Sequence, residues 1–122
     1  MEKRKLGTQG LEVPAIGLGC MGMSISYGVR DPEIAIATIH RAIEMDAGFL
    51  DTSDAYGRGA NEELLARALE GGRRDRVILA SKFGNRRQPD GSTIVSGSPK
   101  DVADACEASL QRLDTDHIDL LY

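Results

Sequence analysis

The sequence predicts an α/β protein with a parallel sheet, and two observations carry this prediction. Short apolar runs with strand character recur along the chain, starting near residues 15, 48, 77 and 118. A segment with helix-capping residues and a helical apolar face lies in each interval between them. This alternation, with strands beginning about 30 to 40 residues apart, is typical of βα units joined by right-handed crossovers.

The chain is expected to open with a hairpin and to continue with four strands. In the hairpin, Lys5–Leu6 and Leu11–Val13 flank the turn-forming segment Gly7–Gly10. The expected strands that follow are Ala15–Leu18, Gly48–Leu50, Val77–Ala80 and Ile118–Tyr122.

The first expected helix begins at Pro32. Asp31 can accept hydrogen bonds from the first free amides, and a proline fits the first helical position because its missing donor would be unpaired there. Isoleucines spaced three and four residues apart then form one helical face. Gly48 is expected to provide a left-handed stop for this helix.

Two further helices are expected. The second begins near Asn61, where Glu62 suits the positive helix end, and it ends at Gly71–Gly72. The third opens at Ser98, a cap residue followed three positions later by Asp101.

The segment from Gly84 to Gly97 reads as a long irregular loop with a turn at Asp90–Gly91. It follows a strand and precedes a helix, where functional loops of α/β proteins gather. Residues 1–122 form one expected domain. A closed eight-stranded barrel needs about 250 residues, so this length suits half of one or a small open sheet, with two unpaired edges in either case.

Composition excludes several classes of function. The formal charge of −4, with charges of both signs, does not favour nucleic-acid binding. No apolar run approaches the roughly 20 residues of a membrane span, and Met1–Leu6 shows no secretory signal. Cys20 and Cys106 lie too far apart to suggest a metal site, and we expect none. So few cysteines fit a reducing compartment, so we expect a cytoplasmic protein.

A glycine motif, Gly17–Gly22, reads G-x-G-x-x-G after an apparent strand. A dinucleotide-binding turn of this kind needs a helix directly after it, whereas the next expected helix starts only at Pro32. Two other interpretations are open. The glycines can allow a tight turn at a strand end, or they can let the backbone lie flat against a ligand.

Three residues suggest chemistry: Asp51 and Lys82 at the ends of consecutive strands, and Tyr56 in the loop after the first of them. Carboxyl ends of parallel strands face the ligand crevice, so the three side chains should meet there. An ammonium held by a carboxylate favours the phenolate form of a neighbouring tyrosine. Such a tyrosine can give a proton to a carbonyl oxygen while a nicotinamide supplies hydride.

Each of these residues also has an ordinary structural interpretation. An aspartate at a strand end commonly accepts hydrogen bonds in a turn, a lysine there is commonly solvated, and a loop tyrosine commonly packs with a wet hydroxyl. Their joint placement at consecutive strand ends is what favours the functional interpretation.

Several ordered segments, which together cover essentially the whole chain, carry a resemblance to a known family. The sequence resembles the aldo-keto reductases, in the branch of bacterial and plant aldehyde reductases related to potassium-channel β-subunits. The segments that carry the resemblance are Leu6–Gly19, Leu50–Gly57, Asn61–Leu65, Ser81–Gly84, Ser109–Leu113 and Ile118–Leu120.

The resemblance implies a parallel (β/α)8 TIM-type barrel, of which residues 1–122 would be the N-terminal half with about four βα units. It implies NADPH (NADP) as cofactor, small aldehydes or ketones as substrates, and Asp51, Tyr56 and Lys82 as catalytic residues. Cys20, Met21 and Gly22 would lie beside the nicotinamide ribose, with Asp51 also touching it. The family's catalytic histidine is expected about two residues after Tyr122, so neither His117 nor His40 takes that role.

The resemblance leaves the activity of these 122 residues open. A truncated barrel of this kind is expected to show little turnover and weak NADPH binding. As an alternative, a half-barrel can act as a non-catalytic interaction module that pairs with itself or with another half, because it exposes apolar strand faces and two edges.

Overall fold

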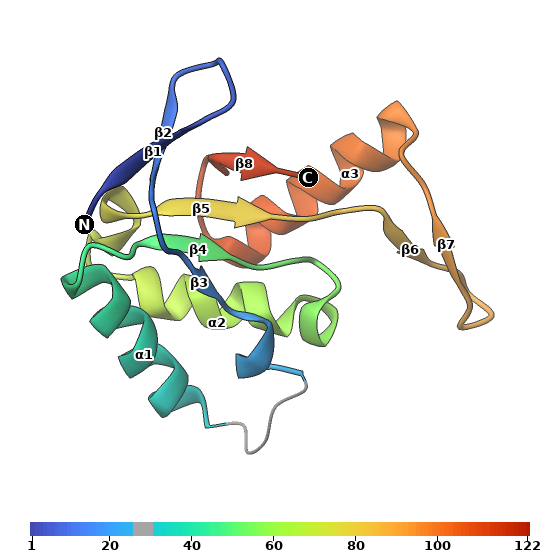
Figure 1. Cartoon of the computed structure of the whole chain (residues 1–122). Helices are drawn as coiled ribbons and strands as arrows, with labels where there is room; N and C mark the ends of the chain where they lie inside the picture. The colour runs from blue at the N-terminus through green and yellow to red at the C-terminus, as the bar shows by residue number, and fades with distance from the viewer. Residues whose placement is uncertain (26–30) are drawn as a thin grey trace.

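The computed structural model describes residues 1–25 and 31–122, and at its centre lies a parallel sheet in the order β3–β4–β5–β8 (Figure 1). Leu50 of the second strand pairs with Leu18 on one side and with Leu79 on the other. The predicted α/β class and the alternation of strands and helices are confirmed. The sheet strands are β3 (Leu18–Gly19), β4 (Phe49–Asp51), β5 (Ile78–Ser81) and β8 (Leu120–Leu121).

The helices α1 (Pro32–Glu44), α2 (Ala60–Leu69) and α3 (Pro99–Leu113) pack side by side against the sheet (Figure 1). Both predicted caps are confirmed. Asp31 accepts from the amides of the first turn of α1, and Ser98 accepts from the third residue of α3. Within residues 1–25 and 31–122, no helix is long and apolar enough to cross a membrane.

The hydrophobic core lies between the helices and one face of the sheet. Leu50 and Leu79, at the centres of neighbouring strands, are completely buried there. Because side chains alternate along a strand, Asp51 and Ala80 project toward the opposite face. The core residues are Cys20, Ile39, Ile43, Leu50, Leu65, Ala68, Leu69, Val77, Leu79 and Leu113.

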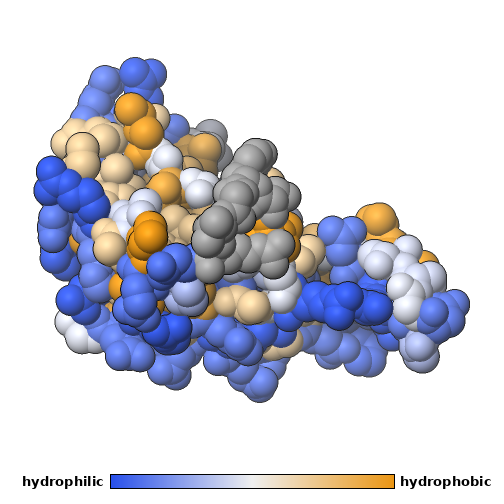
Figure 2. Space-filling view, turned by 90° about the horizontal axis from the view of Figure 1, so that it is seen from below, coloured by the Kyte–Doolittle hydropathy of each residue, from blue (hydrophilic) through white to orange (hydrophobic). Residues whose placement is uncertain are grey.

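Two antiparallel hairpins flank the sheet. The first, formed by β1 (Lys3–Leu6) and β2 (Leu11–Pro14), confirms the predicted opening hairpin. The second, formed by β6 (Asn85–Arg87) and β7 (Thr93–Val95), corrects the expectation of an irregular loop from Gly84 to Gly97. It extends away from the body of the molecule, and its strand residues are all exposed (Figures 1 and 2).

Some predicted boundaries are wrong. The first sheet strand begins at Leu18, three residues later than expected, because its pairing with β4 starts there. Helix α1 ends at Glu44 and the left-handed residue after it is Asp46, with φ 57°, so Gly48 does not stop this helix. The predicted stop of α2 at Gly71–Gly72 is confirmed by φ values of 71° and 79°, and the 3-10 turn η3 (Arg73–Arg76) follows.

The glycine motif does not form a dinucleotide-binding turn. Its last two residues belong to the 3-10 turn η1 (Met21–Met23), and the next helix among the described residues, α1, begins at Pro32. The chain does turn tightly after β3, in η1, but Gly17, Gly19 and Gly22 all have φ outside the left-handed region, so this turn does not require the conformational freedom of glycine. The structure instead shows a close approach, since a Cβ on Gly17 would lie 2.7 Å from the carbonyl oxygen of Phe49.

Candidate functional site

Asp51, Tyr56 and Lys82, called the trio below, come together at the carboxyl ends of β4 and β5. Asp51 is the last residue of β4 and Lys82 directly follows β5. The register pairs Asp51 with Ala80, and Lys82, two residues further on, projects to the same face and reaches the Asp51 carboxylate. Their neighbours Thr52 and Ser81 are completely buried on the helix side. The side chains of Asp51 and Lys82 are 30% and 32% exposed, so they occupy the rim of the open face.

The Lys82 ammonium is held by three acceptors. It forms a short ion pair with the Asp51 carboxylate, and it donates to the Thr52 carbonyl oxygen at 2.9 Å and to the Tyr56 hydroxyl oxygen at 3.1 Å. An ammonium has three protons, so these contacts use all of them. The orientation of the charge is therefore fixed.

The direction of the contact between Lys82 and Tyr56 is unambiguous. Lysine has no acceptor, so the Tyr56 oxygen must accept and its own proton points elsewhere. Within residues 1–25 and 31–122, no group accepts a hydrogen bond from that hydroxyl. The phenolic proton is thus available to a ligand at the mouth of the site.

The environment of Lys82 keeps it charged. Burial by itself would lower the pKa of Lys82, but hydrogen bonds with Asp51 and Tyr56 outweigh burial and raise that pKa above its ordinary value of 10.5. The side chain therefore carries a full positive charge at neutral pH.

A tight turn after β4 delivers Tyr56 to this place. The Tyr56 amide donates to the Ser53 carbonyl at 3.1 Å, and the Asp54 amide donates to the Lys82 carbonyl at 3.2 Å. The 3-10 turn η2 (Tyr56–Gly59) then leads into α2, with Gly59 at φ 92°. Backbone hydrogen bonds thus join the tyrosine loop to the end of β5.

A buried carboxylate, that of Glu62, lies behind the trio. The sequence analysis identified Glu62 only as a residue suited to a helix N-terminus. Glu62 is completely buried and accepts from Ser81 Oγ and from Arg112 Nε, both at 2.7 Å. Arg112 also donates to Ser109. Because Ser81 precedes Lys82, this network ties α2 and α3 to the strand end that carries the lysine.

Tyr122 is a second phenol at the site, and sequence reasoning missed it. Its hydroxyl donates to the free oxygen of the Asp51 carboxylate at 2.9 Å. Burial and the Asp51 charge raise the pKa of Tyr122 above its usual 10.0. The available signal was the parallel pairing of β5 with β8, which sets Leu121 opposite Ser81 and therefore brings Tyr122 beside Lys82.

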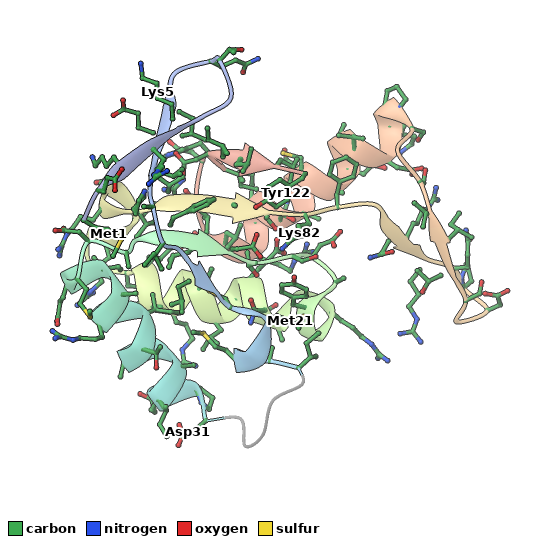
Figure 3. All side chains as sticks on the ribbon, viewed as in Figure 1. Met1, Lys5, Met21, Asp31, Lys82 and Tyr122 are labelled. Carbon is green, nitrogen blue, oxygen red and sulfur yellow. The ribbon has the colours of Figure 1, made fainter. Side chains whose placement is uncertain are left out.

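Cys20, Met21 and Gly22 follow β3 and lie at the start of η1, where Met21 is labelled in Figure 3. The Cys20 amide donates to the Asp51 carbonyl at 2.9 Å. Burial, and then the Asp51 charge, raises the pKa of the Cys20 thiol to about 12. This thiol is therefore neutral and unreactive, and the turn acts as a wall of the site.

The two histidines make contacts away from the trio. His117 precedes β8, at the opposite end of the sheet, and its Nδ1 lies 2.6 Å from an oxygen of Asp116. His40 Nε2 lies 2.8 Å from the carbonyl oxygen of Ala68, in the last turn of α2. In the described part of the chain, no group of His, Cys, Asp or Glu side chains could hold a metal ion.

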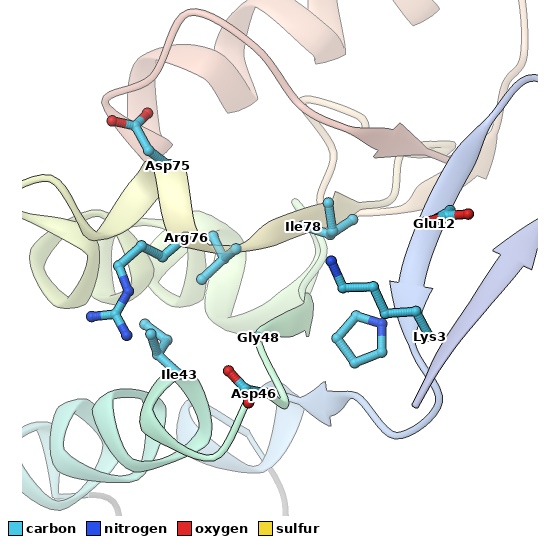
Figure 4. Close-up of a pocket in the computed structure, with 10 residues that line it drawn as sticks. Lys3, Glu12, Ile43, Asp46, Gly48, Asp75, Arg76 and Ile78 are labelled. Carbon is cyan, nitrogen blue, oxygen red and sulfur yellow. The ribbon is translucent and has the colours of Figure 1, made fainter. Parts of the chain in front are cut away.

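A separate hollow lies at the other end of the sheet, where β4 and β5 begin (Figure 4). Its volume is about 270 Å³, and Lys3 and Glu12 of the opening hairpin face Arg76 and Ile78 across it. Since the trio occupies the carboxyl ends of the same strands, this hollow is not part of the candidate site.

Comparison with known proteins gives one consistent result. The sequence model of the Aldo/keto reductase family matches residues 15–122. An aldo-keto reductase from Bacillus halodurans, solved in its holo form, is 39% identical with a TM-score of 0.84, covering 99% of this chain and 39% of that one.

Two structures of aldo-keto reductase from Klebsiella pneumoniae are similar as well. One, in complex with NADP and acetate, is 30% identical with a TM-score of 0.70, over 93% of this chain and 36% of that one. The other, in complex with NADPH, is 29% identical with a TM-score of 0.73, over 99% and 39%. The present chain thus spans about two fifths of the length of the structures it matches.

Proposed function

The chain belongs to the aldo/keto reductase family, and we propose that its trio delivers the proton in an NADPH-dependent reduction of aldehydes or ketones to alcohols. The observation that carries this proposal is the hydrogen bond from Lys82 to the Tyr56 oxygen at 3.1 Å, which leaves the phenolic proton free. A substrate carbonyl oxygen placed at the Tyr56 hydroxyl would receive that proton.

Each member of the trio has one task in this proposal. The nicotinamide, when bound, supplies the hydride that adds to the carbonyl carbon. Tyr56 gives its proton to the oxygen as the C=O π electrons move onto it, which leaves a tyrosinate and an alcohol. The Lys82 ammonium stabilises the tyrosinate, and Asp51 keeps that ammonium in place.

The residues present fit the reacting end of such a cofactor. The half-buried Asp51 carboxylate can accept from a ribose hydroxyl, and the turn of Cys20, Met21 and Gly22 bounds the space beside it. We propose that these residues hold the nicotinamide ribose. The Klebsiella pneumoniae structures, which contain NADP and NADPH, support the choice of cofactor.

The test is turnover by a completed barrel in which residues 1–122 are joined to the C-terminal part of the Bacillus halodurans reductase. Tyr56→Phe should lower kcat by about 10²- to 10⁴-fold, the usual contribution of a general acid. The matched control is Tyr122→Phe, which removes the other phenol of the site and should cost less than about tenfold. Unchanged turnover in Tyr56→Phe would exclude Tyr56 as the proton donor. Residues 1–122 alone should show little turnover and weak NADPH binding.

A second candidate function is self-association, which the open face of the sheet favours. The helices cover the core side, and Ile16 before β3 and Tyr122 after β8, next to the two edge strands, are 66% and 47% exposed. Within the described residues, the edges of β3 and β8 are unpaired in the sheet. Light scattering of residues 1–122 tests this candidate, and a monodisperse monomer at high concentration would exclude it.

A further inference from the structure

We propose that Asn61 is a positioning residue of this site, which fixes the turn from Cys20 to Ser24 against β4 and thereby sets where the nicotinamide binds. The inference rests on the proposed reductase function. It assigns to Asn61 no contact with substrate or cofactor.

Asn61 is completely buried in the first turn of α2, and its side-chain amide is fully used. Its Oδ1 accepts from Thr52 Oγ1 at 2.6 Å. Its Nδ2 donates to the Cys20 carbonyl at 2.9 Å and to Ser24 Oγ at 2.8 Å. Both amide protons and the amide oxygen therefore hold other parts of the chain.

These bonds join the segments that surround the trio. Thr52 carries the carbonyl oxygen that accepts from the Lys82 ammonium. The Cys20 amide donates to the Asp51 carbonyl, so the turn is attached to β4 at that point as well. The Asn61 side chain therefore contacts Thr52, which itself accepts from the Lys82 ammonium, and it also contacts Cys20, at the start of the turn that borders the site.

Ser24 also packs against the tyrosine loop. A Cβ on Gly57, the residue after Tyr56, would lie 3.2 Å from the Ser24 Cβ, so turn and loop are in close contact. Asn61 holds Ser24 in that contact from the other side. The width of the site between Tyr56 and the turn therefore depends on the Asn61 amide.

The effect of losing this amide should be selective. The contacts among Asp51, Tyr56 and Lys82 do not include Asn61, so proton delivery should keep its pH dependence. The turn, in contrast, would lose two of its hydrogen bonds to α2. We expect a change in nicotinamide binding with no change in the acid–base behaviour of the trio.

Asn61→Asp is the sharpest variant, because it has nearly the same shape and can still accept from Thr52 but cannot donate to the Cys20 carbonyl. In the completed barrel, it should raise the KM and the Kd for NADPH about tenfold or more, as expected when a buried acceptor loses its donor. The pH profile is read in Asn61→Ala, which removes the same donors without adding a charge, and there the midpoint of the pH profile of kcat should stay where it is. Ser24→Ala should give a smaller rise by itself and little further rise in the Asn61→Asp background.

The matched control is His40→Ala. His40 lies in α1, and its substitution removes a hydrogen bond to the Ala68 carbonyl, at the end of α2 opposite to Asn61. It should lower stability without changing the KM for NADPH. An equal rise in KM in His40→Ala would overturn the inference, because general destabilisation would then explain the effect. If Asn61→Asp does not yield a folded barrel, Ser24→Ala decides, since an unchanged KM in that variant also contradicts the inference.

A readout without cofactor is hydrogen exchange in residues 1–122. The Met23 and Ser24 amides donate within the turn, and their exchange should speed up in Asn61→Asp relative to Leu79 in the core strand. Unchanged exchange at these amides would overturn the inference. The proposed function fails separately: Tyr56→Phe would then remain active, whatever the exchange rates of the turn show.

Discussion

Replacing Arg112 with leucine tests the buried network behind the site. Glu62 is completely buried, while the Arg112 side chain is 27% exposed and contacts it through Nε at 2.7 Å. After Arg112→Leu, Glu62 keeps its hydrogen bond from Ser81 but has no cation beside it. A carboxylate would then be buried without a counter-ion.

Removing one partner of a buried ion pair costs about 3 to 5 kcal/mol in free energy of unfolding. Because water reaches part of the Arg112 side chain, we take the lower end, about 3 kcal/mol. A domain of this size is stable by about 5 to 15 kcal/mol, so the loss would be a large fraction. It corresponds to a fall in Tm of about 10 °C.

Urea unfolding followed by circular dichroism measures this loss. The control is Arg41→Leu, which breaks an exposed ion pair with Glu44 and should cost less than about 0.5 kcal/mol. The double variant of Arg112→Leu with Glu62→Gln should recover part of the loss, because the remaining group is neutral. Equal effects of Arg112→Leu and Arg41→Leu would show that Arg112 does not neutralise a buried charge.

Two further predictions concern stability. Gly59→Ala should lower the free energy of unfolding by about 1 to 3 kcal/mol, since φ is 92° and the new Cβ would lie 2.5 Å from Arg112 Cδ; Gly72→Ala, at φ 79° with open space, should cost less. Stability should also fall as pH rises above 9, because the folded chain keeps the proton of Cys20, whose pKa is about 12, while the unfolded chain releases it. This loss reaches about 4 kcal/mol by pH 12, and Cys20→Ala should remove it. The raised pKa of Lys82 adds a loss of the same sign above its ordinary value of 10.5, and urea titrations from pH 8 to 11 measure the combined slope.

Local signals predicted the elements whose causes are local. The side chains of Asp31 and Ser98 accept from backbone amides only three residues further along the chain, so the sequence is enough to find these caps. The hairpin of β6 and β7 was not predicted because neither strand has a buried face, and without one there is no apolar alternation to detect. Gly48 was a reasonable stop for α1, but the short side chain of Asp46 also tolerates the left-handed region.

The predicted trio came together because one rule suffices to place it: in a parallel sheet, strand ends that follow one another meet at one edge. The supporting residues needed information that no local pattern holds. Asn61 contacts Cys20 across 41 positions, and Glu62 contacts Arg112 across 50. Their residue types suit a helix N-terminus, so their sequence context gave no reason to expect burial.

The site contains two phenols, and the direction of their hydrogen bonds distinguishes them. A carboxylate can only accept, so the Tyr122 hydroxyl must donate its proton to a hydrogen bond with Asp51. The pKa of Tyr122 is also raised, which makes Tyr122 a weaker acid. An ammonium can only donate, so Tyr56 receives a hydrogen bond and keeps its proton free. Asp51 lies between them, bound to Lys82 through one oxygen and to Tyr122 through the other. The same carboxylate therefore directs the ammonium toward one tyrosine and occupies the proton of the other, which is why we assign proton delivery to Tyr56.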